Sequence, residues 1–277
     1  MNRINIKYQE AIKQNREKRK KIGRTIFMFS LLLLFIAFVI DLLISVVATL
    51  IILLIFAGIS IICLILMLVL PIFLSEKPLF EVLVDEIIKD INLNEQRNID
   101  YLSYPKEKEL FNRSGLYPKG TSKLNRFQMM MSTDYHTNVN LFFTEIFTQT
   151  DKSKIVYLKG LYIKFDTMNQ NIFQIRKKGK ERHKDIKLNK EVREDKTIIY
   201  TDGQPIKENY LSLYDKLDER YKQVDISGIK RQVHIAIHDF FNFKREKKIT
   251  QDIYNEYYKM IKETIDLVDE ISKDISN

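Results

Sequence analysis

The chain has 277 residues, of which 45% are hydrophobic and 29% are charged, and its formal net charge is +9. A single cysteine excludes a disulfide within the chain. Residues 1–24 carry nine Lys or Arg and two Glu, a net +7, which leaves only +2 for the rest of the chain. The body of the protein is therefore not strongly basic, and no nucleic-acid recognition motif accompanies its charges.

An apolar run from Ile26 to Leu74 contains one charge, Asp41. One helical crossing of a bilayer takes roughly 20 apolar residues, so this run predicts a transmembrane helical hairpin over residues 25–74. An Asp carboxylate at a helix centre costs about 2.5–3.5 kcal/mol. We therefore interpret Asp41 as lying near the bend, where it can reach headgroups and water; a functional Asp41 buried in the hairpin is the alternative.

The basic arm, residues 1–24, sets the expected topology. Positive flanks stay cytoplasmic, and two crossings return the chain to its starting side. The apolar run is too long for a cleavable signal peptide. We therefore expect a multi-pass protein of the bacterial inner membrane with both termini in the cytoplasm. Seven basic residues of the arm are expected to contact anionic phospholipid headgroups: Lys13, Arg16, Lys18, Arg19, Lys20, Lys21 and Arg24.

Residues 75–120 are expected to form a membrane-proximal helical connector. Apolar residues at spacings of three and four predict an amphipathic helix over Leu79–Leu93. A second helix is expected over Pro105–Asn112, ending at Ser114–Gly115, where glycine can adopt the left-handed conformation.

Residues 121–277 predict a cytoplasmic α+β domain with a mostly antiparallel sheet packed with helices. Alternating apolar residues indicate strands over 139–147, 155–165, 172–175, 197–201 and 233–237, and Gly160 is interpreted as punctuation between them. Helices are predicted over Ile206–Tyr221 and Thr250–Ile275. The apolar stripe of the last helix is interpreted as packing on the sheet, with an oligomerising coil as the alternative.

A second basic cluster, Arg176–Lys196, holds ten Lys or Arg and five acids. Runs of mixed charge with few apolar residues are typical of solvated loops. Contact with anionic lipid is the alternative for this cluster, and nucleic acid is the weaker one.

The sequence offers no catalytic, cofactor-binding or metal-binding constellation. Gly115–Ser122 resembles a phosphate-binding loop, but its lysine precedes the second glycine instead of following it. His234 and His238 lie about 13 Å apart on a strand, too far for one ion, and we expect them on an exposed face. Glu145 interrupts an apolar strand, and we expect it to face water or a lysine.

Several segments follow the apolar run in a fixed order. They are Ser114-Gly-Leu-Tyr117, Val139–Phe147, Val156–Asp166, Ile198–Asp202, Leu211–Leu217, Val233–Ile237 and Phe240-Phe241, followed by the closing helix. This order resembles a bacterial membrane family, domain of unknown function 3137, whose members are uncharacterised. The resemblance covers most of the chain from Ile22 onward. It implies two N-terminal spans followed by a cytoplasmic domain, and it implies no activity.

The expected function is that of a membrane-anchored cytoplasmic binding or scaffolding module. Its expected partners are the lipid bilayer and an unidentified protein, and the sequence leaves a homo-oligomer open. The alternative from another class is an enzyme that acts on lipid or envelope precursors at the inner membrane surface. A component of a membrane transport assembly is a third option.

Overall fold

The computed structural model describes residues 2–41, 58, 77–102, 114–118, 121–133, 138–150, 153–168, 171–178, 187–240 and 249–276. The chain divides into two compact units, Met1–Val84 with Arg245–Gln251, and Asp85–Lys244 with Asp252–Asn277. Helix α1 (Asn2–Asp41) belongs to the first unit, and helix α3 (Lys77–Glu95) begins in the first unit and ends in the second.

Much of the expected transmembrane hairpin, residues 42–57 and 59–74, lies outside the described residues, as does the expected helix Pro105–Asn112. Within the described part of the chain, no helix is both long enough and apolar enough to cross a membrane.

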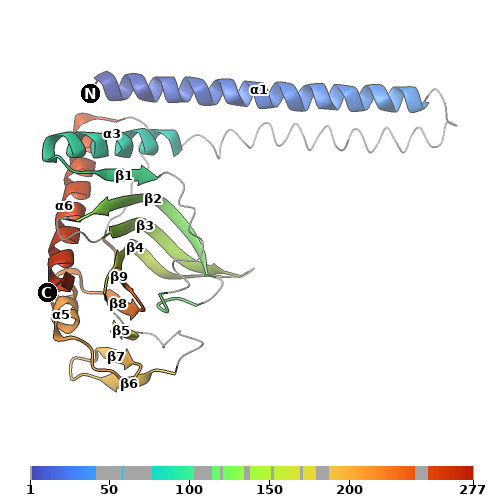
Figure 1. The fold of residues 1–277 in the computed structure, drawn as a ribbon. Coiled ribbons are helices and arrows are strands. Elements are labelled where there is room, and N and C mark those ends of the chain that lie inside the picture. Colours follow the sequence, from blue (N-terminus) through green and yellow to red (C-terminus); the bar gives the residue numbers. More distant parts are fainter. Residues whose placement is uncertain are drawn as a thin grey trace. The chain divides into compact units, whose positions relative to one another are not determined.

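The second unit contains a nine-stranded sheet in the order β1-β2-β3-β4-β9-β8-β5-β7-β6 (Figure 1). Every described pairing is antiparallel, which confirms the α+β prediction with its antiparallel sheet. The strands are β1 (Ile99–Leu102), β2 (Ser122–Ser132), β3 (Asn138–Gln149), β4 (Lys154–Asp166), β5 (Phe173–Arg176), β6 (Asn189–Val192), β7 (Ile198–Thr201), β8 (Val224–Ile229) and β9 (Gln232–His238).

Two helices of this unit, α5 (Glu208–Tyr221) and α6 (Gln251–Ser276), lie on one side of the sheet (Figure 1). Tyr257, Ile261, Ile265 and Val268 of α6 are all buried, so its apolar stripe is used for packing within the chain. Ion pairs tie the outer surfaces of the two helices together, with Lys216 Nζ 2.8 Å from Glu270 Oε1. The packing interpretation of the last helix is therefore confirmed.

The central strands are buried on both faces. In β3, Leu141 and Phe143 are inaccessible on one face, and Phe142 and Ile146 on the other. The second face has its own apolar cluster, which consists of Leu116, Tyr117, Phe142, Ile146, Leu158, Tyr162 and Ala236. Polar residues that alternate with apolar ones in these strands therefore point into a covered layer, not into solvent.

Gly160 lies in the middle of β4, between Thr144 of β3 and His238 of β9. A Cβ atom at this position would come within 2.2 Å of the Ile237 carbonyl oxygen. The interpretation of Gly160 as punctuation between strands was therefore wrong. Glycine is required here because the backbone of β9 approaches closely.

The cluster Arg176–Lys196 is not simply a solvated loop. Arg176 ends β5 and is 5% exposed, Leu188 is buried, and residues 189–192 form β6, whose side chains are exposed. Residues 179–186 lie outside the described residues. The loop prediction was wrong for Arg176 because that strand end is covered.

Candidate functional site

A row of polar side chains crosses the sheet face that is opposite to α5 and α6. The register aligns Asn140, Lys164, His234, Ser227 and Gln174 on five neighbouring strands. All five are buried, with His234, Ser227 and Gln174 at 0% exposure. Burying polar groups is unfavourable unless they form hydrogen bonds. The hydrogen-bond partners of these side chains therefore indicate the role of this face.

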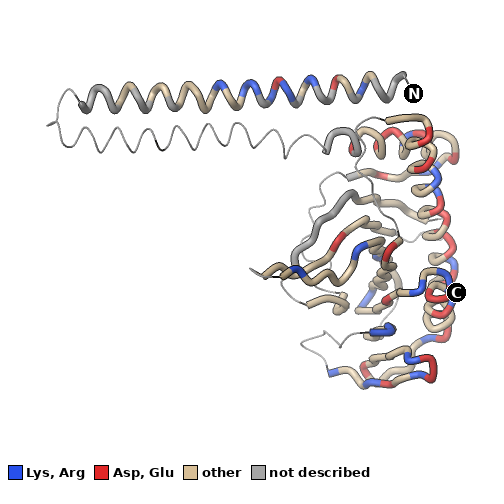
Figure 2. Tube along the Cα trace, turned by 180° about the vertical axis from the view of Figure 1, so that it is seen from behind, with Lys and Arg blue, Asp and Glu red and all other residues tan. Residues whose placement is uncertain are grey.

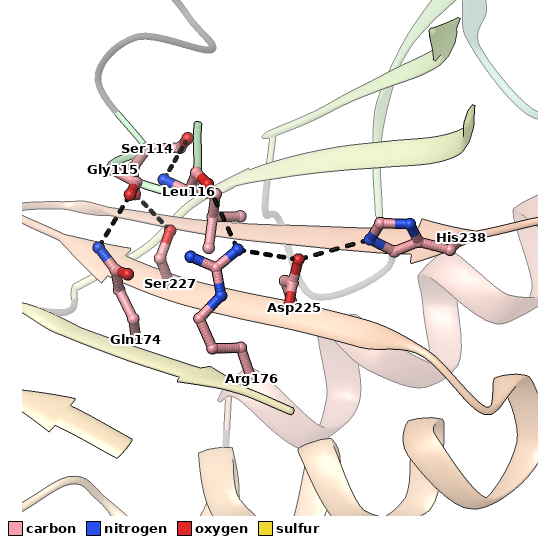
Figure 3. A network of polar contacts seen from close by, with 8 residues as sticks. All are labelled: Ser114, Gly115, Leu116, Gln174, Arg176, Asp225, Ser227 and His238. Atoms are coloured by element: carbon pink, nitrogen blue, oxygen red, sulfur yellow. Dashed lines mark hydrogen bonds and ion pairs between the residues drawn. The ribbon is translucent and has the colours of Figure 1, made fainter. Parts of the chain in front are cut away.

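The face holds a short segment of the chain itself, Ser114–Tyr117, which we call the docked segment. Three consecutive carbonyl oxygens of this segment accept hydrogen bonds from sheet side chains (Figure 3). Ser227 Oγ donates to Ser114 O at 2.7 Å, and Gln174 Nε2 donates to Gly115 O at 3.0 Å. Arg176 Nη2 donates to Leu116 O at 3.4 Å. Three side chains of the sheet thus recognise the backbone of the docked segment.

Local geometry of the docked segment fits this role. Gly115 has φ +69°, a left-handed conformation that glycine adopts without a steric penalty, as predicted. The Leu116 N–H donates to Ser114 Oγ at 3.2 Å, which closes a turn. Leu116 and Tyr117 then enter the apolar cluster of the same face. The segment is therefore fixed by its carbonyls at one end and by two large side chains at the other.

Arg176, Asp225 and His238 form a linear chain of polar contacts beside the docked segment (Figure 3). Arg176 Nη2 lies 3.2 Å from Asp225 Oδ2, and the same oxygen lies 3.4 Å from His238 Nε2. Arg176 and Asp225 are each 5% exposed. The carboxylate compensates the buried guanidinium, which in turn binds the Leu116 carbonyl.

His234 is fully buried, and its Nδ1 lies 2.8 Å from the Tyr162 hydroxyl. The predicted exposed face for His234 was therefore wrong, because strand β9 is covered on both sides. His238, at the end of the same strand, is partly exposed. The two imidazoles have different partners, Tyr162 and Asp225, so they do not face a common ion.

Two tyrosines of this face have perturbed acidity. Burial raises the pKa of Tyr117 well above its ordinary value, and the Asp225 carboxylate adds to the effect. Burial also raises the pKa of Tyr162, while a hydrogen bond with the Ser114 side chain opposes that shift.

The raised pKa values of Tyr117 and Tyr162 predict how the stability of the domain changes at alkaline pH. A phenol whose folded pKa exceeds its unfolded pKa contributes stability that is complete below the unfolded pKa, about 10, and is lost as the pH rises above it. We expect Tyr117 and Tyr162 to ionise only as the domain unfolds. Tyrosinate absorbance and circular dichroism, followed together through an alkaline titration, check this. A Tyr117→Phe/Tyr162→Phe variant should lose the late part of the absorbance change; an unaltered profile would contradict the expectation.

A second prediction concerns the Ser227 hydroxyl. Ser227→Ala leaves the buried Ser114 carbonyl without this donor, which should lower the free energy of unfolding by about 1–3 kcal/mol. Ser212→Ala, on the exposed face of α5, is the matched control. Urea midpoints of the full-length protein in detergent measure both. Equal midpoints for the two variants would show that the docked segment does not depend on Ser227.

The residues selected from the sequence lie elsewhere. The side chains of Lys13, Arg16, Lys18, Lys20, Lys21 and Arg24 are exposed on α1, and that of Arg19 lies outside the described side chains. Asp41 ends α1, and its side chain is likewise not described. Glu145 Oε1 lies 2.5 Å from Lys154 Nζ, so the expected lysine partner of Glu145 is confirmed.

Sequence reasoning missed Gln174, Arg176, Asp225 and Ser227. A signal was present, because Phe-Gln-Ile-Arg176 and Val-Asp-Ile-Ser227 both alternate apolar and polar residues. Such alternation normally indicates a strand with one buried face and one solvated face. In this protein the second face is covered as well, so the polar residues are buried, and this became evident only from the fold. Within the described ranges, no group of three or more His, Cys, Asp or Glu residues could hold a metal ion.

No family model, curated protein or solved structure matches this chain. The resemblance to domain of unknown function 3137 stays a prediction.

Proposed function

We propose that this protein is a two-span, membrane-anchored binding or scaffolding module, with both termini on the cytoplasmic side of a bacterial inner membrane. The observation that carries the proposal is the two-part chemistry of α1. Its N-terminal half carries most of its Lys and Arg residues (Figure 2), whereas seven large apolar side chains between positions 27 and 36 are exposed. They are Phe27, Met28, Phe29, Leu31, Leu32, Phe35 and Ile36, which are between 42% and 65% exposed.

A contiguous exposed apolar surface is rare on soluble monomers and marks contact with a protein or a membrane. The sequence continues in the same apolar character to Leu74 with no further charge after Asp41. Lipid is the partner that fits a run of this length, because a hairpin of two helices buries it entirely in the hydrocarbon core.

The helical geometry of α1 divides the seven predicted lipid contacts into two groups. At a rise of about 1.5 Å per residue, Lys20 and Lys21 lie within ~6 Å of Arg24 along the axis, whereas Lys13 lies ~16 Å away. Screening at physiological ionic strength reduces charge interactions beyond ~8 Å. For a helix that stands upright in the membrane, headgroup contact is therefore concentrated at Arg19, Lys20, Lys21 and Arg24, which all lie within ~8 Å of Arg24 along the axis.

Matched triple variants test this division. In nanodiscs that contain a photoactivatable anionic phospholipid, Lys20→Ala/Lys21→Ala/Arg24→Ala should lose most of the lipid crosslinking to residues 1–24. Lys13→Ala/Arg16→Ala/Lys18→Ala removes the same charge and should retain most of it. Equal losses of lipid crosslinking in the two triple variants would indicate that residues 1–24 lie along the membrane surface.

The anchoring itself is tested in cells. We expect the full-length protein to stay with membranes after washing with high salt and alkaline carbonate. In a Cys63→Ala background, a cysteine introduced at Asn277 should resist a membrane-impermeant thiol reagent in intact cells and react after lysis. Labelling from outside the intact cell would contradict the proposed topology.

The docked segment supports a binding role over catalysis. Ser227, Gln174 and Arg176 of the buried polar face bind the chain's own carbonyls. Their contacts are those of backbone recognition. Crosslinking in intact cells followed by purification of the full-length protein should recover a specific partner. Hydrolysis of nucleotide, lipid or peptide substrates by the purified protein would contradict the proposal that it is a binding or scaffolding module.

A further inference from the structure

We draw no further inference here: the strongest candidate, the edge of strand β4 at residues 154–159, where Ile155 and Val156 are exposed, carries no proposal because nothing in the structure shows what covers it.

Discussion

Gly160→Ala is expected to lower the free energy of unfolding by about 3 kcal/mol, the upper end of the usual range for overpacking. The added Cβ would lie 2.2 Å from the Ile237 carbonyl oxygen and 3.3 Å from the Asp239 nitrogen. Both atoms belong to backbone, so no flexible side chain can move aside. The strand end that carries His238 must shift instead, which also disturbs its contact with Asp225.

Urea unfolding of the full-length protein in detergent, followed by tyrosine fluorescence, measures this loss. Lys159→Ala changes the preceding, exposed residue and should alter the free energy of unfolding by no more than ~0.5 kcal/mol. If the two variants unfold at the same urea concentration, the close approach of β9 to β4 is not present in the protein.

The sequence predicted five strands correctly, β3, β4, β5, β7 and β9, and the alternation is strongest in β3 and β4. Residues 139–147 and 155–165 lie in β3 and β4, and the helices predicted over Leu79–Leu93, Ile206–Tyr221 and Thr250–Ile275 match α3, α5 and α6 to within a few residues. In each of these strands and helices, the spacing of the apolar residues matches the face that packs against the rest of the domain. Local pattern was sufficient for these elements because each buries one face against its neighbours.

Four strands were missed for physical reasons that differ. Strand β2, Ser122–Ser132, has a bulge between Asn125 and Phe127 and three consecutive methionines, so its apolar residues do not alternate regularly. Strand β1 is four residues long at the sheet edge, and β6 lies in a highly charged run whose exposed side chains carry no apolar alternation. Strand β8, Val224–Ile229, does alternate, but Asp225 and Ser227 gave it the composition of a turn. Short strands of this kind are held by their neighbours in the sheet, which the sequence does not show.

The candidate site could not be predicted from the spacing of apolar and polar residues in the sequence alone. Arg176 and Asp225 are 49 positions apart in the chain, and the register between β5 and β8 places them opposite one another. Ser227 and Ser114 are separated by 113 positions. The resemblance drew attention to Ser114–Tyr117, and the partners of that segment required the fold.

Asp225→Ala is expected to cost the largest part of the stability, about 3–5 kcal/mol, because it removes one partner of a buried ion pair. The buried Arg176 guanidinium would lose its contact with the Asp225 carboxylate, and so would His238 Nε2. Arg176→Met/Asp225→Leu, which removes both charges, should be less destabilised than the two single variants added together. A double-mutant cycle on urea midpoints measures the difference.

The exposed pair Arg193 and Asp215 provides the matched control. Its atoms Nη1 and Oδ1 are 2.8 Å apart, closer than the buried pair, yet the side chains are 35% and 46% exposed. Solvent screens such pairs, so Asp215→Ala should change the free energy of unfolding by less than ~1 kcal/mol. Burial, not distance, is thus expected to decide which ion pair matters. Equal losses for Asp225→Ala and Asp215→Ala would mean that water reaches the Arg176 guanidinium and that the polar face beneath the docked segment is open.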